Sequence, residues 1–132
     1  MAKVVSFSEA ASIALHAMIL VARAKGTMNV DKIAEITQSS RHHVAKVMQR
    51  LAKDGYVGSY RGPKGGFYLS KNAEKISLLE IYECIEGILL PNSCAAEKPI
   101  CNFEHCIMNN ITHELTAQFK NYMAGQMINN FV

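Results

Sequence analysis

The sequence has no apolar stretch long enough to cross a bilayer, which takes ~18–20 consecutive apolar residues. The nearest approach is Ala10–Ala24, which is interrupted by His16 and Arg23. The N-terminal residues also lack the basic region and cleavage site of a secretory signal peptide. These absences lead us to expect a soluble, cytoplasmic protein without a membrane partner.

The sequence also lacks the patterns that carry common enzyme chemistry. It has no recognisable nucleophile–base pair, no paired catalytic carboxylates and no glycine-rich loop that would cradle a phosphate. With 132 residues, 49% of them hydrophobic, the chain can bury the core of one domain, or of a small domain plus an extension. We therefore expect a protein that is not an enzyme and has no catalytic residues.

Charge is spread unevenly along the chain, although the net charge is only +3. Residues 1–75 carry twelve Lys or Arg and five acids, which gives +7. Residues 76–132 carry two Lys and six Glu, which gives −4. A basic first half and an acidic second half indicate that binding of a polyanion such as DNA belongs to the first half.

Two helices separated by a tight turn are predicted in this basic half. The first is short, with Asp31 as its N-cap. The second is capped by Ser39 or Ser40 and ends at Asp54-Gly55. Its apolar stripe consists of Val44, Val47, Met48 and Leu51, and its opposite face is rich in His, Lys and Arg. A short helix, a turn and an amphipathic helix with a basic outer face are typical of a helix-turn-helix.

A charged hairpin is predicted directly after these helices. Two β-prone runs, 56–60 and 67–70, flank the loop Arg61-Gly62-Pro63-Lys64-Gly65-Gly66. Glycine permits positive φ and close backbone approach, and proline stiffens the loop. This order of elements predicts a winged helix, with Arg61 and Lys64 presenting charge at the tip of the wing.

Three further helices are expected at about residues 8–25, 77–87 and 104–126. Ser6 with Glu9, and Ser77 with Glu80, have the spacing of a capping box at the start of the first two. The last helix has an apolar stripe that a single projecting helix cannot bury alone. The stripe consists of Ile107, Ile111, Leu115, Phe119, Tyr122 and Met123. We expect it to pack against a second copy of the chain; the alternative is that it folds back on its own domain.

Four cysteines occur in the second half of the chain. Cys84 falls inside a predicted helix and is expected to be a buried free thiol. The others are spaced Cys94-x6-Cys101-x4-Cys106, and Cys106 is placed near the N-terminus of the last helix, whose dipole favours a thiolate. Three thiolates suit an iron–sulfur cluster. Thiol-based redox sensing without a metal, or zinc, remain alternatives, although structural zinc sites usually use closely spaced pairs.

These residues together resemble the Rrf2 family of bacterial winged-helix transcription regulators. The resemblance runs from Ser6 to about Phe131 and depends most on the wing, on the helix start Ile76-Ser77-Leu78-Leu79-Glu80-Ile81, and on the three-cysteine loop. It implies a homodimer that binds a palindromic operator in double-stranded DNA. It also implies an iron–sulfur cluster of two or four irons, held by Cys94, Cys101 and Cys106, that adjusts DNA affinity.

The resemblance leaves the fourth ligand of such a cluster open. In the family's cluster assembly regulators a histidine follows the third cysteine by three residues, where this chain has Asn109; His113 lies on the same helical face. In its nitric-oxide sensors the fourth ligand is an acid in the first helix of the other subunit, which points to Glu9. The candidates are therefore Glu9 and His113.

The expected fold is mainly α with a small β-hairpin: a winged helix-turn-helix over residues 1–75, then a cysteine loop and a long dimerisation helix over residues 76–132. The residues expected to bind DNA are Ser40, Arg41, His42, His43, Lys46, Arg61, Gly62, Pro63, Lys64 and Gly65. The expected function is a DNA-binding regulator, acting as a repressor, whose cluster senses redox state, nitric oxide or iron–sulfur status. The alternatives are a cluster-free regulator that senses thiols or cysteine metabolism and, from another class, an iron–sulfur electron carrier.

Overall fold

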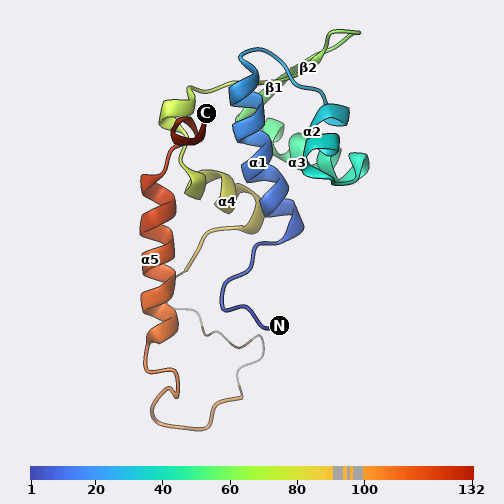
Figure 1. Cartoon of the computed structure of the whole chain (residues 1–132). Coiled ribbons are helices and arrows are strands. Elements are labelled where there is room, and N and C mark those ends of the chain that lie inside the picture. The colour runs from blue at the N-terminus through green and yellow to red at the C-terminus, as the bar shows by residue number, and fades with distance from the viewer. Residues whose placement is uncertain (91–93, 95, 97–99) are drawn as a thin grey trace.

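A computed structural model describes residues 1–90, 94, 96 and 100–132. Its elements, in chain order, are α1 (Glu9–Ala24), α2 (Val30–Thr37), α3 (Arg41–Lys53), β1 (Val57–Tyr60), β2 (Gly66–Leu69), the 3-10 helix η1 (Ala73–Lys75), α4 (Leu78–Glu86), α5 (Ile111–Gly125) and the 3-10 helix η2 (Ile128–Phe131) (Figure 1). The predicted mainly α fold with one small hairpin is confirmed. Among the described residues, no helix combines the length and the apolarity that crossing a membrane requires.

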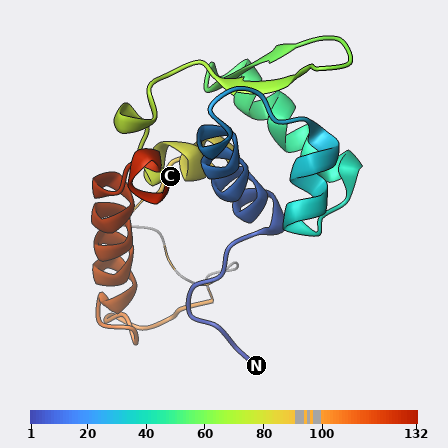
Figure 2. The same cartoon turned by 45° about the horizontal axis from the view of Figure 1, so that its top comes forward.

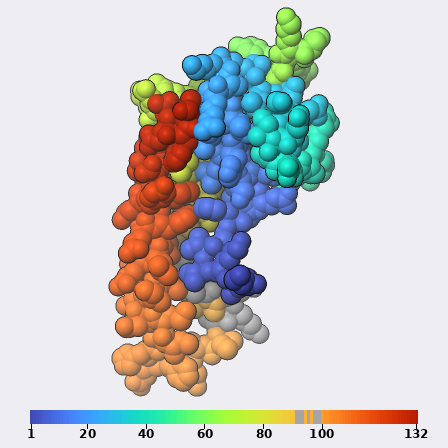
Figure 3. Space-filling view, viewed as in Figure 1, coloured from blue at the N-terminus to red at the C-terminus, as the bar shows by residue number. Residues whose placement is uncertain are grey.

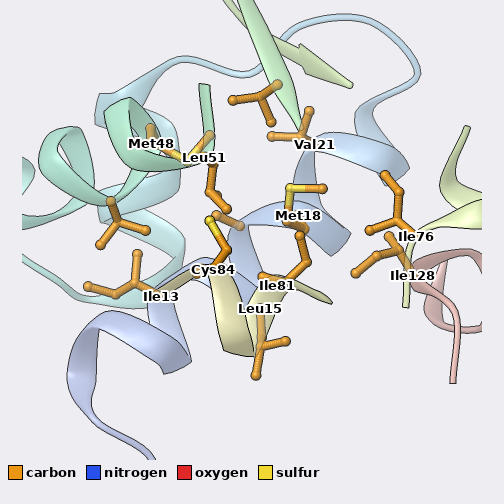
Figure 4. Packing of buried hydrophobic residues seen from close by; sticks show 14 of the residues in the cluster. Ile13, Leu15, Met18, Val21, Met48, Leu51, Ile76, Ile81, Cys84 and Ile128 are labelled. Atoms are coloured by element: carbon orange, nitrogen blue, oxygen red, sulfur yellow. The ribbon is translucent and has the colours of Figure 1, made fainter. Parts of the chain in front are cut away.

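The hydrophobic core is built around α1. Ala14, Ala17 and Met18 of this helix are completely buried, and α1 contacts α2, α3, α4, β2 and η2. Figure 4 shows Met18 between Leu51 of α3 on one side and Ile76 and Ile128 on the other, with Ile81 of α4 next to it. The small alanines let neighbouring helices approach α1 closely, so one helix organises both the helix-turn-helix with its wing and the C-terminal half.

The helix-turn-helix and the wing have the predicted order, and their limits lie within two residues of those expected. Val44, Val47, Met48 and Leu51 of α3 are all buried, as the apolar stripe predicts. Strands β1 and β2 pair antiparallel, and the linker before α2 joins them because Met28 and Phe67 exchange two backbone hydrogen bonds of 2.9 Å. At Gly66, a Cβ would lie 2.8 Å from the carbonyl carbon of Met28, so this close approach requires glycine.

The helix N-termini confirm two predicted caps and correct two others. Ser40 caps α3, and Ser77 with Glu80 forms the complete capping box of α4. The cap of α2 is Asn29 and not Asp31, so Asp31 lies in the first turn of that helix. The Ser6–Glu9 box is also wrong, because Ser8 caps α1 by accepting a hydrogen bond from the Ala11 amide. Asn and Ser are equally good caps, so spacing alone did not choose between neighbouring polar residues.

The last residues of the chain return to the core, which the sequence did not predict. The Ile128 amide donates to the Ile76 carbonyl at 2.8 Å, and the Leu78 amide donates to the Gln126 carbonyl at 2.8 Å. Ile128 is completely buried, and the Arg23 guanidinium donates to the Phe131 carbonyl at 2.6 and 2.9 Å. The C-terminus is therefore held against both α1 and the start of α4, and the division of the chain at residue 75 stays a prediction.

Helix α5 begins later than predicted and buries only part of its apolar stripe. It starts at Ile111 and not near Glu104, because Asn109 and Asn110 take positive φ values of 48° and 65°, which interrupt a helix. Phe119 packs on Tyr82 of α4 with ring centroids 5.4 Å apart, and Met123 is buried. The outward-facing apolar residues of α5 are Ile111, Leu115 and Tyr122, which are exposed. One edge of the apolar stripe therefore packs against its own chain, and the other edge is exposed to solvent.

Replacing Ser77 by Ala should lower the free energy of unfolding by about 1 kcal/mol, because the α4 capping box loses the hydroxyl that accepts from the Glu80 amide at 3.1 Å. Urea denaturation followed by circular dichroism measures this loss. The control is Ser70→Ala, which removes an exposed hydroxyl outside any helix cap. Equal stabilities for the two variants would contradict the importance of the capping box.

Candidate nucleic-acid interface and cysteine loop

The outer face of α3 presents polar and basic side chains to solvent. Arg41, His42 and Lys46 are exposed and His43 is half-buried, while the opposite side of the helix lies in the core. In Figure 3 the turn and helices α2 and α3 form one side of the molecule, with the wing projecting above them. This face has the length of about three helical turns, which a major groove accommodates.

Ser40 has a structural role at the start of α3. Its hydroxyl accepts a hydrogen bond from the His43 amide at 3.0 Å, which makes Ser40 the N-cap. The side chain is exposed, so the same residue also lies at the surface beside Arg41.

Two acids from other helices reach the first turn of α3. Asp31 of α2 pairs with Arg41, with its Oδ1 2.5 Å from the Arg41 Nε. Glu9 of α1 lies with its Oε1 3.3 Å from the Nδ1 of His43. Both pairs join α3 to the helices that pack behind it, and neither acid was predicted from the sequence to contact α3.

The wing and the start of α3 share one groove. This groove has a volume of about 380 Å³. It is lined by Asn29, Val30, Asp31, Arg41, Ser59, Tyr60, Gly62, Pro63, Gly65, Gly66 and Phe67. Arg41, Gly62, Pro63 and Gly65 are thus predicted DNA-binding residues that the fold brings together. Arg61 and Lys64 are exposed on the same loop.

The wing is supported from within. Tyr60 and Tyr68 stack with ring centroids 4.7 Å apart. Gly62 takes a φ of 109° and its carbonyl accepts from the Gly65 amide at 2.9 Å, which closes the turn. A Cβ at Gly65 would lie 2.3 Å from the Tyr60 carbonyl oxygen. Gly62 and Gly65 are therefore required by the backbone conformation and close approach of the turn. The side chains of Arg61 and Lys64 are exposed to solvent.

Residues 100–110, the described segment that carries Cys101 and Cys106, lie at the end of the molecule opposite the wing (Figures 1 and 2). Cys94, Cys101 and Cys106 are exposed free thiols. Positions 95 and 97–99 of the loop lie outside the described residues. Cys106 was predicted at or near the N-terminus of the last helix; α5 starts five residues later, after the Asn109–Asn110 break, so Cys106 lies outside the helix.

The loop cysteines are the right kind of ligand for an iron–sulfur cluster, but their positions among the described residues are not those of a cluster site. Three thiols are the donors that such clusters use. However, no three His, Cys, Asp or Glu side chains within residues 1–90, 94, 96 and 100–132 lie close enough together to hold a metal ion. Of the two candidate fourth ligands, Glu9 is occupied with His43 in the first turn of α1, and His113 is exposed on α5.

Cys84 is buried, as predicted, and is part of a polar network between α3 and α4. Its thiol donates to the Asp54 Oδ2 at 2.9 Å, and the same oxygen lies 3.8 Å from the Arg50 Nε. Burial, followed by this hydrogen bond, raises the pKa of Cys84 to about 11. Beside it, burial and the nearby Glu80 carboxylate raise the pKa of Tyr56 to about 12. The C-terminal end of α3 is thus attached to α4, the helix that leads into the cysteine loop.

Comparisons with known proteins agree with this architecture. Residues 7–132 match the sequence model of the Rrf2 family, described as an iron-dependent transcriptional regulator. A protein of Aquifex aeolicus described as an HTH-type transcriptional regulator is 31% identical over 136 aligned positions, covering 96% of this chain and 90% of that protein. The transcriptional regulator IscR of Klebsiella pneumoniae is 28% identical over 110 positions, covering 80% of this chain and 67% of IscR.

Among solved structures, the fold is similar to that of CymR, the global cysteine regulator of Bacillus subtilis. The TM-score is 0.78 at 20% sequence identity, covering 96% of this chain and 95% of CymR. At this identity the likeness establishes the shared fold.

Cys84 should react much more slowly with iodoacetamide than the loop cysteines. At pH 8 its thiol stays protonated because its pKa is raised to about 11, and only the thiolate is nucleophilic. Peptide mass spectrometry after timed alkylation of the native, reduced protein measures each rate. Burial is the main cause of this raised pKa and the Asp54 carboxylate adds to it, so Asp54→Asn should lower the pKa in part and speed labelling of Cys84. Labelling of Cys84 as fast as Cys101 in the native protein would contradict the assignment.

Proposed function

The chain belongs to the Rrf2 family of transcriptional regulators, and we propose that it binds double-stranded DNA with α3 and the wing under control of the cysteine loop. The observation that carries the proposal is the groove in which Arg41 of α3 lies beside the wing loop. In a winged helix, one element that enters a major groove and a second that follows the neighbouring backbone give both sequence reading and affinity.

DNA reading is assigned to the first turns of α3. Arg41 and Lys46 are exposed cations that can donate to guanine O6 and N7, and His42 can donate to the same acceptors. Arg61 and Lys64 on the wing would lie in or along the adjacent minor groove, where the negative potential is strongest in A/T-rich DNA. DNA binding thus belongs to residues 1–75 and sensing and dimerisation to residues 76–132.

A homodimer follows from the open edge of α5. Ile111, Leu115 and Tyr122 expose an apolar strip of a helix whose other edge is already packed against α4. A second copy of the same strip, related by a two-fold axis, would cover it. A two-fold dimer presents two copies of α3 and so requires a palindromic operator, with repression as the expected outcome of occupancy.

Control is assigned to Cys94, Cys101 and Cys106. An iron–sulfur cluster, when bound, would supply a redox-active centre open to oxygen or nitric oxide; the three thiol donors and the iron-dependent description of the family support it. These three cysteines would hold it, with Glu9 or His113 as a candidate fourth ligand. Because the described thiols are not gathered, the loop would have to close to bring them together.

A second candidate is thiol sensing without a metal. The observation that favours it is the exposure of all three loop thiols, which leaves them open to oxidants in solution. The structurally similar CymR is a cysteine regulator by name, which places cysteine metabolism among the signals to be tested.

Arg61→Ala should weaken binding to an operator duplex, obtained by selection from random sequences with the wild-type protein, by about 1–3 kcal/mol, because a wing contact to DNA is lost. Gel-shift titration at two salt concentrations measures the change. The matched control is Lys75→Ala, which removes an exposed positive charge in η1, outside the wing and α3. If Arg61→Ala binds like the wild type, the wing takes no part in DNA binding.

Cys101→Ser should abolish the visible absorption and the bound iron and sulfide of protein reconstituted without oxygen, because one of three loop ligands is removed. Cys84→Ser is the control and should retain both, since Cys84 lies away from the loop. Wild-type protein that stays colourless, but whose DNA affinity changes on thiol oxidation, would favour the second candidate. A Cys101→Ser variant that retains iron and sulfide would refute the ligand assignment.

A further inference from the structure

The ion pair between Arg41 and Asp31 lies in the groove between α3 and the wing, on the surface proposed to bind DNA. Arg41 is the first residue of α3, and Asp31 lies in the first turn of α2. Their side chains are 74% and 69% exposed, and both line the groove shared with the wing. A surface ion pair adds little to folding stability, so its consequence lies in what it does to the arginine.

The pair fixes one edge of the guanidinium and leaves the other edge open. Asp31 contacts Nε at 2.5 Å, whereas a bidentate contact to guanine O6 and N7 can use the two terminal amino groups. A free arginine side chain has many rotamers, and holding it in one of them lowers the entropic cost of reading a base.

The carboxylate also acts against contacts that carry no sequence information. Arg41, Arg61 and Lys64 are exposed cations around this groove, and each could pair with a phosphate of any sequence. The negative charge of Asp31 beside Arg41 repels the phosphates of DNA and offsets the positive charge with which Arg41 would attract them. Discrimination commonly needs such a repulsive element beside the attractive one.

We propose that Asp31 is a specificity-determining residue: it orients Arg41 toward a guanine and opposes its use as a phosphate contact. The inference depends on the proposed function, because it concerns how the DNA-binding surface selects sequence. Asp31 touches no base in this scheme and acts through Arg41.

The test is selection of bound duplexes from a randomised pool, carried out with the full chain and with Asp31→Asn. The wild type should enrich a guanine at one position of each half-site, and Arg41→Ala should lose that preference. Asp31→Asn should reduce the preference about fivefold or more, which lies within the discrimination of a bidentate contact. Its binding to random DNA should tighten, with a salt dependence steeper by about one unit of slope.

Glu35→Gln is the matched control. Glu35 is on the same helix and pairs with Lys32 at 3.9 Å, so this variant removes one negative charge without touching Arg41. It should leave the guanine preference unchanged. In the Arg41→Ala background, Asp31→Asn should cause no further loss of preference at that position.

Three results would overturn the inference. Asp31→Asn could keep the wild-type guanine preference, Glu35→Gln could lower it equally, or Asp31→Asn could act without Arg41. If none of the proteins enriches any sequence, the proposed DNA-binding function itself fails, and that result is distinct from the other three. Circular dichroism of each variant verifies that all are folded.

Discussion

The burial of one face of α1 is the constraint on which the rest of the structure depends. Ala14, Ala17 and Met18 have no solvent exposure, and the helix contacts α3, α4, the second wing strand and the C-terminal 3-10 helix. A larger side chain at either alanine would displace several elements at once, because protein interiors are close-packed. The position of α3 relative to the wing is therefore set by packing behind them.

Helix α3 is joined to its surroundings at both ends by polar contacts. Arg41 and His43 meet acids from α2 and α1 at its start, and Asp54 accepts from the Cys84 thiol of α4 at its end. The last contact is a direct polar connection between the end of α3 and α4, the helix that precedes the cysteine loop. A rotation of α4 would therefore break a part-buried hydrogen bond at the C-terminal end of α3.

The elements that were predicted well from the sequence are those that a local pattern specifies. The apolar stripe of α3, the Ser77–Glu80 box and the Gly62–Gly65 turn of the wing each depend on neighbours within a few residues. The contacts that were missed join residues distant in sequence, such as Arg23 with the Phe131 carbonyl and Phe7 with Phe119. The late start of α5 was missed because an apolar periodicity continues through Asn109 and Asn110, whose left-handed conformations it does not reveal.

Those two asparagines divide the C-terminal half into a part fixed by the core and a part that is independent of it. Beyond them toward Cys101, the described side chains are exposed, so few apolar contacts oppose a rearrangement there. Chemical change at the thiols can therefore reshape the loop at little expense to folding. The exposed loop thiols are thus separate from the residues that keep the protein folded, so a chemical change confined to that loop would leave the helix-turn-helix and the wing intact.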